Sequence, residues 1–175
     1  MQDYGIAPFV STPRVVVFWP MDTIKGPLYT VRRAEQPPAL EGRWSEGVWA
    51  GVPALRIAHF HPRSSEHRPA SEAKLLYDSE CLYVHFRVRD RYVRAVAQGY
   101  QGAVWADSCA EAFLQPREGR GYFNFEMNCG GTLLLYHIRD HRRTREGFAD
   151  FTPVSEELAS GIRIYHSMPA RVDPE

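Results

Sequence analysis

Hydrophobic and polar positions alternate in short runs through most of the chain from Tyr29 onward, and the runs are rich in β-branched and aromatic residues. Clusters of Gly, Pro, Asp and Ser separate these runs, and no window has a sustained helical period. The pattern predicts strands over residues 28–33, 54–60, 73–77, 82–89, 108–114, 122–128, 133–138 and 162–166. Short strands joined by turns indicate an all-β fold, an antiparallel β-sandwich of the jelly-roll kind.

Two segments interrupt the alternation. The polar segment 62–69 and the basic segment 140–147 are both predicted to be solvated loops. A single helical turn is expected near residues 154–158. Residues 1–27 lack the alternation and are interpreted as an N-terminal arm, followed by one β-sandwich domain over residues 28–175.

The runs 108–114 and 122–128 have the pattern of a β-hairpin. Because side chains alternate between the faces of a strand, Phe123, Phe125 and Met127 are predicted to face the core. The opposite, polar face of the two runs contains Cys109, Glu111, Phe113, Tyr122, Asn124, Glu126 and Asn128. A connection that is symmetric about residues 117–118 pairs Leu114 with Phe123, which places Glu111 opposite Glu126.

Two opposed carboxylates repel each other and need a cation, a shared proton or a hydrogen-bonding ligand between them. In run 82–89 the polar face includes Tyr83, His85, Arg87 and Arg89, and Arg87 or Arg89 supplies the cation if this strand neighbours the hairpin. The assembled face offers donors and acceptors suited to sugar hydroxyls: Tyr83, His85, Arg87, Glu111, Asn124, Glu126 and Asn128. The alternative is an ordinary solvated sheet face, which any antiparallel sheet can present.

Trp105 precedes the strand at 108–114 in a predicted loop. An indole ring in that position offers a flat apolar platform for the C–H face of a pyranose, although a loop tryptophan can also cover the end of a sandwich. Trp44 and Trp49 are expected to cover the core, and Trp19 lies in the N-terminal arm.

The composition limits the classes of partner that the chain is expected to bind. The chain has 175 residues, 44% of them hydrophobic, which is enough for one buried core. Its 21 basic residues balance 21 acidic residues, so we expect neither a nucleic acid nor an anionic membrane as partner. No apolar run approaches the roughly 18 residues of a membrane helix, and the N-terminus has no signal-peptide pattern. Cys81, Cys109 and Cys129 are expected to be free thiols, buried or half-buried.

Several of these segments, taken in order, resemble a known family. The strings Trp-x-Asp-Ser-x-x-Glu-x-Phe at 105–113 and Tyr-Phe-Asn-Phe-Glu at 122–126 are the most specific, and the similarity extends over residues 29–136. In this order they resemble the family 9-like carbohydrate-binding modules. The resemblance implies a non-catalytic sandwich that grips the end of a saccharide chain, with Trp105 as one clamp ring and Glu111 as the carboxylate that binds the sugar.

The resemblance also implies features outside this site. It leads us to expect a linked catalytic domain such as a glycoside hydrolase, an extracytoplasmic location, a structural calcium ion, and further C-terminal strands after residue 175. Position 126 departs from the family pattern, since a glutamate stands where the family has a sugar-binding arginine.

Other functions remain open at this point. The chain could be an interaction domain without a sugar ligand, or a glycoside hydrolase that uses Glu111 and Glu126 as its acid and base. A haem site would need Met127 as a ligand. The pair His59 and His61 has a spacing that zinc tolerates, although solvent-facing histidines are the simpler interpretation. Calcium would be held by carboxylates in positions 107, 111 or 126.

Overall fold

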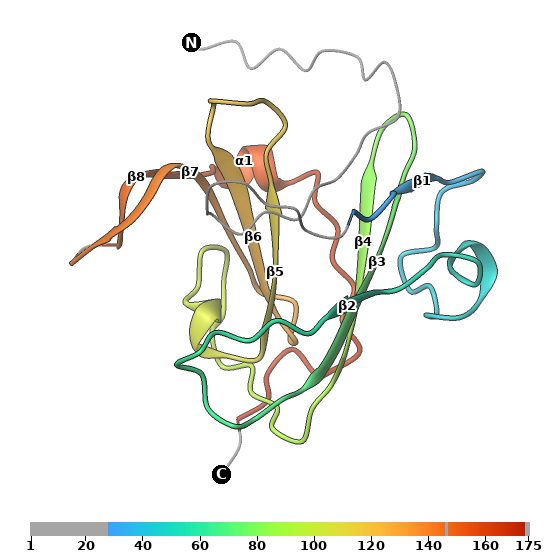
Figure 1. Ribbon diagram of the computed structural model, residues 1–175, viewed down its shortest axis with the longest axis horizontal. Helices are drawn as coiled ribbons and strands as arrows, with labels where there is room; N and C mark the ends of the chain where they lie inside the picture. Colours follow the sequence, from blue (N-terminus) through green and yellow to red (C-terminus); the bar gives the residue numbers. More distant parts are fainter. Residues whose placement is uncertain (1–27, 146, 174–175) are drawn as a thin grey trace. The chain divides into compact units, whose positions relative to one another are not determined.

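The computed structural model describes residues 28–145 and 147–173, and within them nearly all regular structure is β (Figure 1). The strands are β1 (Arg32–Arg33), β2 (Leu55–Ile57), β3 (Ala70–Tyr77), β4 (Leu82–Arg89), β5 (Cys109–Leu114), β6 (Tyr122–Asn128), β7 (Leu133–Thr144) and β8 (Gly147–Pro153). Two 3₁₀ turns, η1 (Gly47–Trp49) and η2 (Val104–Ala106), and the helix α1 (Glu156–Ala159) complete the list. The predicted N-terminal arm lies outside the described residues.

The strands form two four-stranded sheets. In the first sheet β1, β2 and β4 all pair with β3, and β1 runs parallel to it, with Arg32 opposite Leu76. In the second sheet the order is β5-β6-β7-β8 and every pairing is antiparallel. Two such sheets with one short helix confirm the predicted all-β, sandwich-like class. The parallel pairing of β1 is the exception to the predicted antiparallel order.

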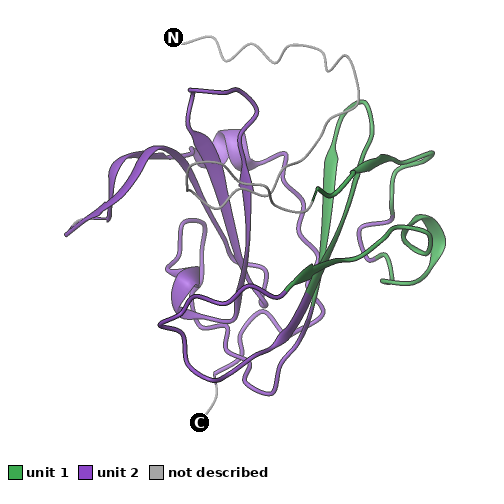
Figure 2. Ribbon diagram, viewed as in Figure 1, with its two compact units in different colours: residues 1–38, 42–57, 72–87 green, residues 39–41, 58–71, 88–175 purple. Residues whose placement is uncertain are grey.

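The described residues divide into two compact units (Figure 2). Unit 1 takes in residues 28–38, 42–57 and 72–87 and holds most of the first sheet. Unit 2 takes in residues 39–41, 58–71 and 88–173 and holds the whole second sheet together with η2 and α1. The strands of unit 2 therefore position the predicted hairpin face.

Unit 1 has its own hydrophobic core. The buried residues form two clusters, one of Ala34, Trp49, Val52 and Leu76 and one of Val31, Ala73 and Leu75. Trp49 is 5% exposed, which confirms its predicted role over the core. Lys74 is also buried, and its Nζ donates to the carbonyl oxygens of Trp44 and Trp49 at 2.8 Å each. These two bonds satisfy a charged group that would otherwise be costly to bury.

Unit 2 buries the hydrophobic face that the hairpin pattern predicts. Phe123, Phe125 and Met127 pack against a buried cluster of Leu133, Leu135 and Ala159, so β6, β7 and α1 share one core. The predicted helical turn is confirmed as α1. Its N-terminus is capped by Ser155, whose Oγ accepts from the amide of Leu158 at 3.3 Å.

The segment 162–166 is not a strand, and that prediction is wrong. Ile162 and Ile164 do pack against the core cluster of unit 2, which explains the alternation of apolar residues in the sequence. The backbone there belongs to no sheet, since β8 takes the place beside β7. An alternating pattern thus marks a buried side of the chain without requiring a paired strand.

The predicted loop at 140–147 is also wrong. β7 continues to Thr144 and β8 starts at Gly147, so the two strands form a ribbon that extends away from β5 and β6 (Figure 1). Two register shifts, between Ile138 and Arg143, bend the ribbon. Arg139 pairs with Asp150 across the strands at 2.5 Å, and both side chains are exposed. This part of the ribbon therefore lacks the alternation of apolar and polar residues by which strands are predicted from a sequence.

Smaller differences concern strand ends. β4 and β6 have the predicted bounds, whereas β1 and β2 are shorter than predicted and β3 begins three residues earlier, at Ala70 instead of residue 73. The loop over residues 62–69 is confirmed. Leu82 and Val88 alternate with the polar residues of β4 and lie at or near its ends, and they are 38% and 49% exposed.

Candidate functional site

The register of the β5–β6 hairpin is the predicted one. Leu114 lies opposite Phe123, and Glu111 lies opposite Glu126. The connection ends at Gly121, whose φ of 79° favours glycine, and a Cβ at this position would collide with the backbone of Ile138 in the neighbouring strand β7. This glycine therefore allows the hairpin to approach β7 closely and helps to set the register.

The polar face of the hairpin brings two carboxylates and a thiol together. Cys109 and Glu111 are two residues apart on β5, so they share a face, and Glu126 lies beside them on β6. The Cys109 sulfur and one carboxylate oxygen from each glutamate all lie within 4.8 Å of one another. Asn124 donates from Nδ2 to Glu126 Oε1 at 2.6 Å.

The β6 side of this face is buried rather than solvated. Asn124 is 2% exposed and Glu126 is 7% exposed. Within the part of the chain that the structure describes, Asn124 Oδ1 and Glu126 Oε2 have no hydrogen-bond partner. Buried polar atoms nearly always have a hydrogen-bond partner in proteins, so these two unpaired oxygens are exceptions to that rule.

The pKa values of both glutamates are raised, chiefly by desolvation. Desolvation, and after it the charge of Glu126, raises the pKa of Glu111 to about 7. Desolvation likewise raises the pKa of Glu126, although the hydrogen bond from Asn124 opposes the shift. The charge of Arg143 lowers both values. Because the Glu111 side chain is exposed, solvent screening weakens these effects there.

Among the described residues, Arg143 is the cation whose charge acts on both glutamates, and the condition set for Arg87 or Arg89, a β4 strand beside the hairpin in one sheet, is not met. β4 pairs with β3 in the first sheet and does not neighbour the hairpin. Arg87 instead donates to Glu72 Oε2 from Nε and Nη2 at 3.1 and 2.6 Å. Sequence reasoning missed Arg143 because it placed this residue in a solvated loop.

The other two predicted residues of β4 also have partners inside unit 1. The hydroxyl of Tyr83 donates to Asp78 Oδ2 at 2.6 Å. His85 lies with its ring edge-on to Trp44 and Trp49, at 5.1 Å from each ring centre, and burial lowers its pKa. The structure therefore does not bring Tyr83, His85 and Arg87 onto the sheet of the hairpin, and their binding roles stay predictions.

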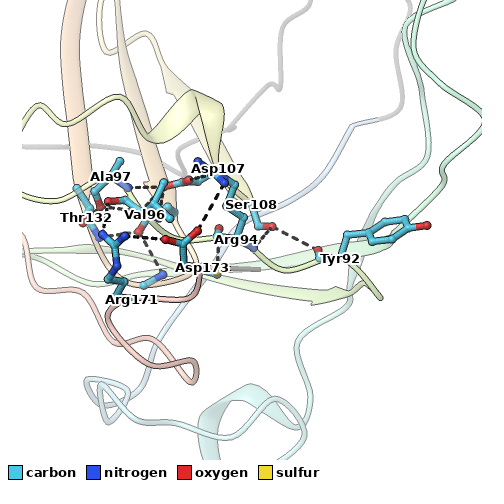
Figure 3. A network of polar contacts seen from close by, with 12 residues as sticks. Tyr92, Arg94, Val96, Ala97, Asp107, Ser108, Thr132, Arg171 and Asp173 are labelled. Atoms are coloured by element: carbon cyan, nitrogen blue, oxygen red, sulfur yellow. Dashed lines mark hydrogen bonds and ion pairs between the residues drawn. The ribbon is translucent and has the colours of Figure 1, made fainter. Parts of the chain in front are cut away.

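Asp107 is the centre of a polar network at the start of β5 (Figure 3). Its side chain is 0% exposed, and Oδ2 accepts from Val96 N at 3.0 Å, Ala97 N at 2.9 Å and Asn128 Nδ2 at 2.9 Å. Oδ1 lies 3.3 Å from the Arg94 guanidinium. Burial alone would raise the pKa of Asp107, but these donors together hold it below its usual value.

Asn128 belongs to the same network. Besides Asp107, its Nδ2 reaches Ala97 O at 3.2 Å, and its Oδ1 accepts from the amides of Gly130 and Thr132 at 3.1 and 2.9 Å. Every polar atom of this side chain thus has a partner within unit 2. The network fixes the loop before β5 onto the end of β6, and it leaves Asn128 little capacity for a ligand.

Trp105 is held at the surface by its neighbours. It lies in η2, where Val104 is 0% exposed and anchors the turn beside β5 and β6, whereas Trp105 itself is 68% exposed. Residues 106–109 form one wall of a recess of about 680 Å³, and residues 90–94 form the other. Trp105 thus directly precedes residues that line this recess, and its exposure is not that of a side chain that covers a core.

The predicted free thiols and solvent-facing histidines can be compared with their exposure in the structure. All three cysteines are free, and Cys109 and Cys129 are half-buried as predicted, but Cys81 is exposed in the turn after β3. Desolvation raises the pKa of Cys109 to about 12. His59 and His61 are both exposed, in accord with the interpretation as solvent-facing side chains.

Two sheets, one short helix and a surface tryptophan beside a recess define an all-β module of the sandwich-like class. A model of Carbohydrate-binding family 9 matches residues 50–159, and the chain belongs to this family. It also matches the crystal structure of a candidate carbohydrate-binding protein from Bacteroides uniformis ATCC 8492, with 26% identity and a TM-score of 0.53. That match covers 63% of this chain and 48% of the other, so the chain spans about half the length of that protein.

No curated protein matches the sequence. None of the helices in the described residues is long and apolar enough to cross a membrane.

Proposed function

We propose that this chain is a non-catalytic module that binds a saccharide through Trp105 and the polar groups of the β5–β6 face. The observation that supports this best is that Trp105 is 68% exposed and directly precedes residues 106–109, which line a recess of about 680 Å³. Recesses of this size suit small ligands, and an exposed indole costs free energy in water unless a partner covers it. Membership in a carbohydrate-binding family gives the class of the ligand.

Glu111 is the second proposed contact. It follows Trp105 by six residues, its side chain is exposed, and its carboxylate can accept hydrogen bonds from sugar hydroxyls. Glu126 and Asn124 are buried, so their proposed role is to position Glu111 and to present hydrogen-bonding groups behind it. A saccharide ligand, with a linked catalytic domain as the neighbour in a longer protein, is the partner that this proposal names.

The test is a binding screen of the full chain against soluble β-glucans, xylans and their short oligomers, by affinity gel and calorimetry. We expect binding by the wild type and a loss of about 30-fold or more in Trp105→Ala, since a buried Trp contact is often worth about 2 kcal/mol. Trp105→Phe should retain part of the affinity. The matched control is Tyr165→Ala, which removes an aromatic ring that is 53% exposed elsewhere in unit 2.

Two outcomes would contradict the proposal. Unchanged affinity in Trp105→Ala would mean that the indole is not the platform, and the absence of binding to any glycan would favour an interaction domain. The opposed carboxylates also suggest a hydrolase, because their oxygens approach within 4.8 Å and a retaining glycosidase places its carboxyl groups about 5–5.5 Å apart. Release of reducing sugar that Glu111→Gln abolishes would establish that alternative.

A further inference from the structure

The cluster of Cys109, Glu111 and Glu126 has a composition that sugar binding does not require. Carboxylate oxygens suit sugar hydroxyls, but a thiol is a weak hydrogen-bonding group. Yet the Cys109 sulfur lies within 4.8 Å of a carboxylate oxygen of each glutamate. One sulfur and two carboxylates at this separation are the donors that surround a divalent cation with sulfur and oxygen ligands.

A second observation points to a ligand at the same place. Glu126 is 7% exposed, and its Oε2 has no hydrogen-bond partner in the described residues, although its carboxylate belongs to the cluster. An unpaired buried acceptor destabilises the fold, and a bound cation would satisfy it. Asn124 holds the other oxygen, Oε1, at 2.6 Å and so orients the carboxylate, as the outer partners of metal ligands do.

We propose that Cys109, Glu111 and Glu126 bind one thiophilic divalent cation of the zinc type. Thiolate sulfur and carboxylate oxygen are both established zinc ligands, and three protein ligands leave a fourth coordination position for water or a hydroxyl group. On binding, the Cys109 thiol gives its proton to solvent and its sulfur bonds to the metal, so no oxidant or other reactant is needed. Glu111 is exposed, so the cluster has one ligand in contact with solvent, and Cys109 is also a lining residue of the recess of about 680 Å³.

The same residues fit calcium poorly. Calcium takes six to eight oxygen ligands and has little affinity for sulfur. Asp107, a predicted calcium ligand, has its oxygens engaged by Val96, Ala97, Asn128 and Arg94. The donor set that remains beside Glu111 and Glu126 includes a thiol, and this favours zinc.

The experiment is a titration of the full chain, first stripped with a chelator and kept reduced, with Zn²⁺ by calorimetry and with Co²⁺ by absorption. We expect one ion per chain and, with cobalt, a near-ultraviolet charge-transfer band from thiolate sulfur. Cys109→Ser should abolish this band, and both Cys109→Ser and Glu111→Gln should weaken binding by at least about tenfold. The matched controls are Cys129→Ser, a second half-buried thiol of unit 2, and Cys81→Ser, and both should bind as the wild type does.

Three results would overturn the proposal: no zinc binding at millimolar metal, unchanged binding in Cys109→Ser, or calcium binding that depends on the glutamates and not on the thiol. Because Glu111 is exposed, Glu111→Gln should fold. This variant therefore still tests the proposal if a substitution at a less exposed position prevents folding. Circular dichroism of each variant checks its folding. The titrations contain no sugar, so their outcome is independent of the proposed saccharide binding.

Discussion

Two acidic side chains of unit 2, Asp107 and Glu126, are both withdrawn from solvent, but they differ in how many partners they have. Asp107 has a side chain that is 0% exposed and receives three hydrogen bonds and one ion pair. Glu126 receives one hydrogen bond, from Asn124, faces a second carboxylate in Glu111, and keeps one oxygen unpaired among the described residues. The environment correspondingly lowers the pKa of Asp107 and raises that of Glu126.

The difference separates a structural acid from a candidate ligand. Asp107 Oδ1 has no hydrogen bond among the described residues, but it is paired with the Arg94 guanidinium at 3.3 Å, whereas Oδ2 receives three hydrogen bonds. A new ligand at Asp107 would therefore have to compete with a cation and three donors. A buried carboxylate with an unfilled site has a cost that a ligand can offset. By the same criterion the polar side chains of β4 resemble Asp107, because Tyr83, His85 and Arg87 contact Asp78, two tryptophan rings and Glu72.

The largest effect on stability is expected for Asp107→Ala. The substitution leaves two backbone amides without their acceptor and removes one of the two acceptors of Asn128 Nδ2. Buried groups that lose a charged partner cost about 3 kcal/mol or more. Urea denaturation monitored by fluorescence measures the change. Asp173→Ala is the control, since that side chain is 52% exposed and should change stability by less than about 0.5 kcal/mol. If Asp107→Ala lowered the free energy of unfolding by less than about 1 kcal/mol, Asp107 would not be a structural acid and would not differ from Glu126 in this way.

The next effect has the opposite sign. Glu126→Gln removes a buried charge that faces Glu111 and keeps a carbonyl oxygen for the Asn124 amide, so we expect stability to rise by about 1 kcal/mol in chelator-treated buffer at neutral pH. The same urea experiment applies. A decrease as large as that of Asp107→Ala would show that Glu126 is a structural acid too.

A smaller effect is expected for Tyr83→Phe, which probes the partnered face of β4. The Tyr83 hydroxyl is the main cause that lowers the pKa of Asp78 below 3.8, followed by the amides of Glu80 and Cys81. Because the folded pKa is the lower one, this carboxylate stabilises the fold above about pH 4, and the contribution is lost as the pH falls through the folded value. Tyr83→Phe should therefore lower Tm by at most a few degrees near neutral pH.

The pH dependence gives a second readout of the same variant. Below pH 4 the Tm of Tyr83→Phe should fall less steeply than that of the wild type, since its Asp78 takes up a proton at a pH closer to that of the unfolded chain. Thermal melts at a series of pH values measure this. Parallel Tm curves for the two proteins would contradict the assigned role of the hydroxyl.

The smallest stability effect is expected for Trp105→Ala. At 68% exposure the indole buries little area, so the free energy of unfolding should change by less than about 0.5 kcal/mol. Together with the proposed loss of saccharide binding, this would identify Trp105 as a surface contact. A destabilisation above about 2 kcal/mol would instead mean that Trp105 packs in the fold, and any binding loss would then follow from unfolding.

Much of unit 2 was predictable because its signals are local. The two-residue alternation over residues 122–128 and the short, glycine-containing connection set the hairpin register, and they placed Glu111 opposite Glu126. The free state of Cys109 and its place on the face of Glu111 also follow from the sequence. Its convergence with both carboxylates was not proposed, because a lone cysteine gives no signal of metal binding.

Other features depended on pairings between distant segments. The alternation of 82–89 predicts a strand with a polar face, but only the sheet order decides that this strand pairs with β3 and not with the hairpin. In the ribbon of β7 and β8, residues 139–144 are all polar and have no apolar alternation, and exposed ion pairs such as Arg139 with Asp150 lie across the strands. For this reason the sequence gives no indication that Arg143 lies near the two glutamates.

The sequence by itself thus determined the strand periodicity, the hairpin register, the residues available on each face and the resemblance to a carbohydrate-binding family. The tertiary structure alone decided which polar groups have partners. Both polar atoms of the Asn128 side chain form hydrogen bonds, Asp107 Oδ2 accepts a hydrogen bond from Asn128, and Glu126 Oε2 has no hydrogen-bond partner among the described residues. The physical reason is that strand formation depends on neighbours in the chain, whereas the pairing of a buried polar atom depends on groups that only folding brings within about 3 Å.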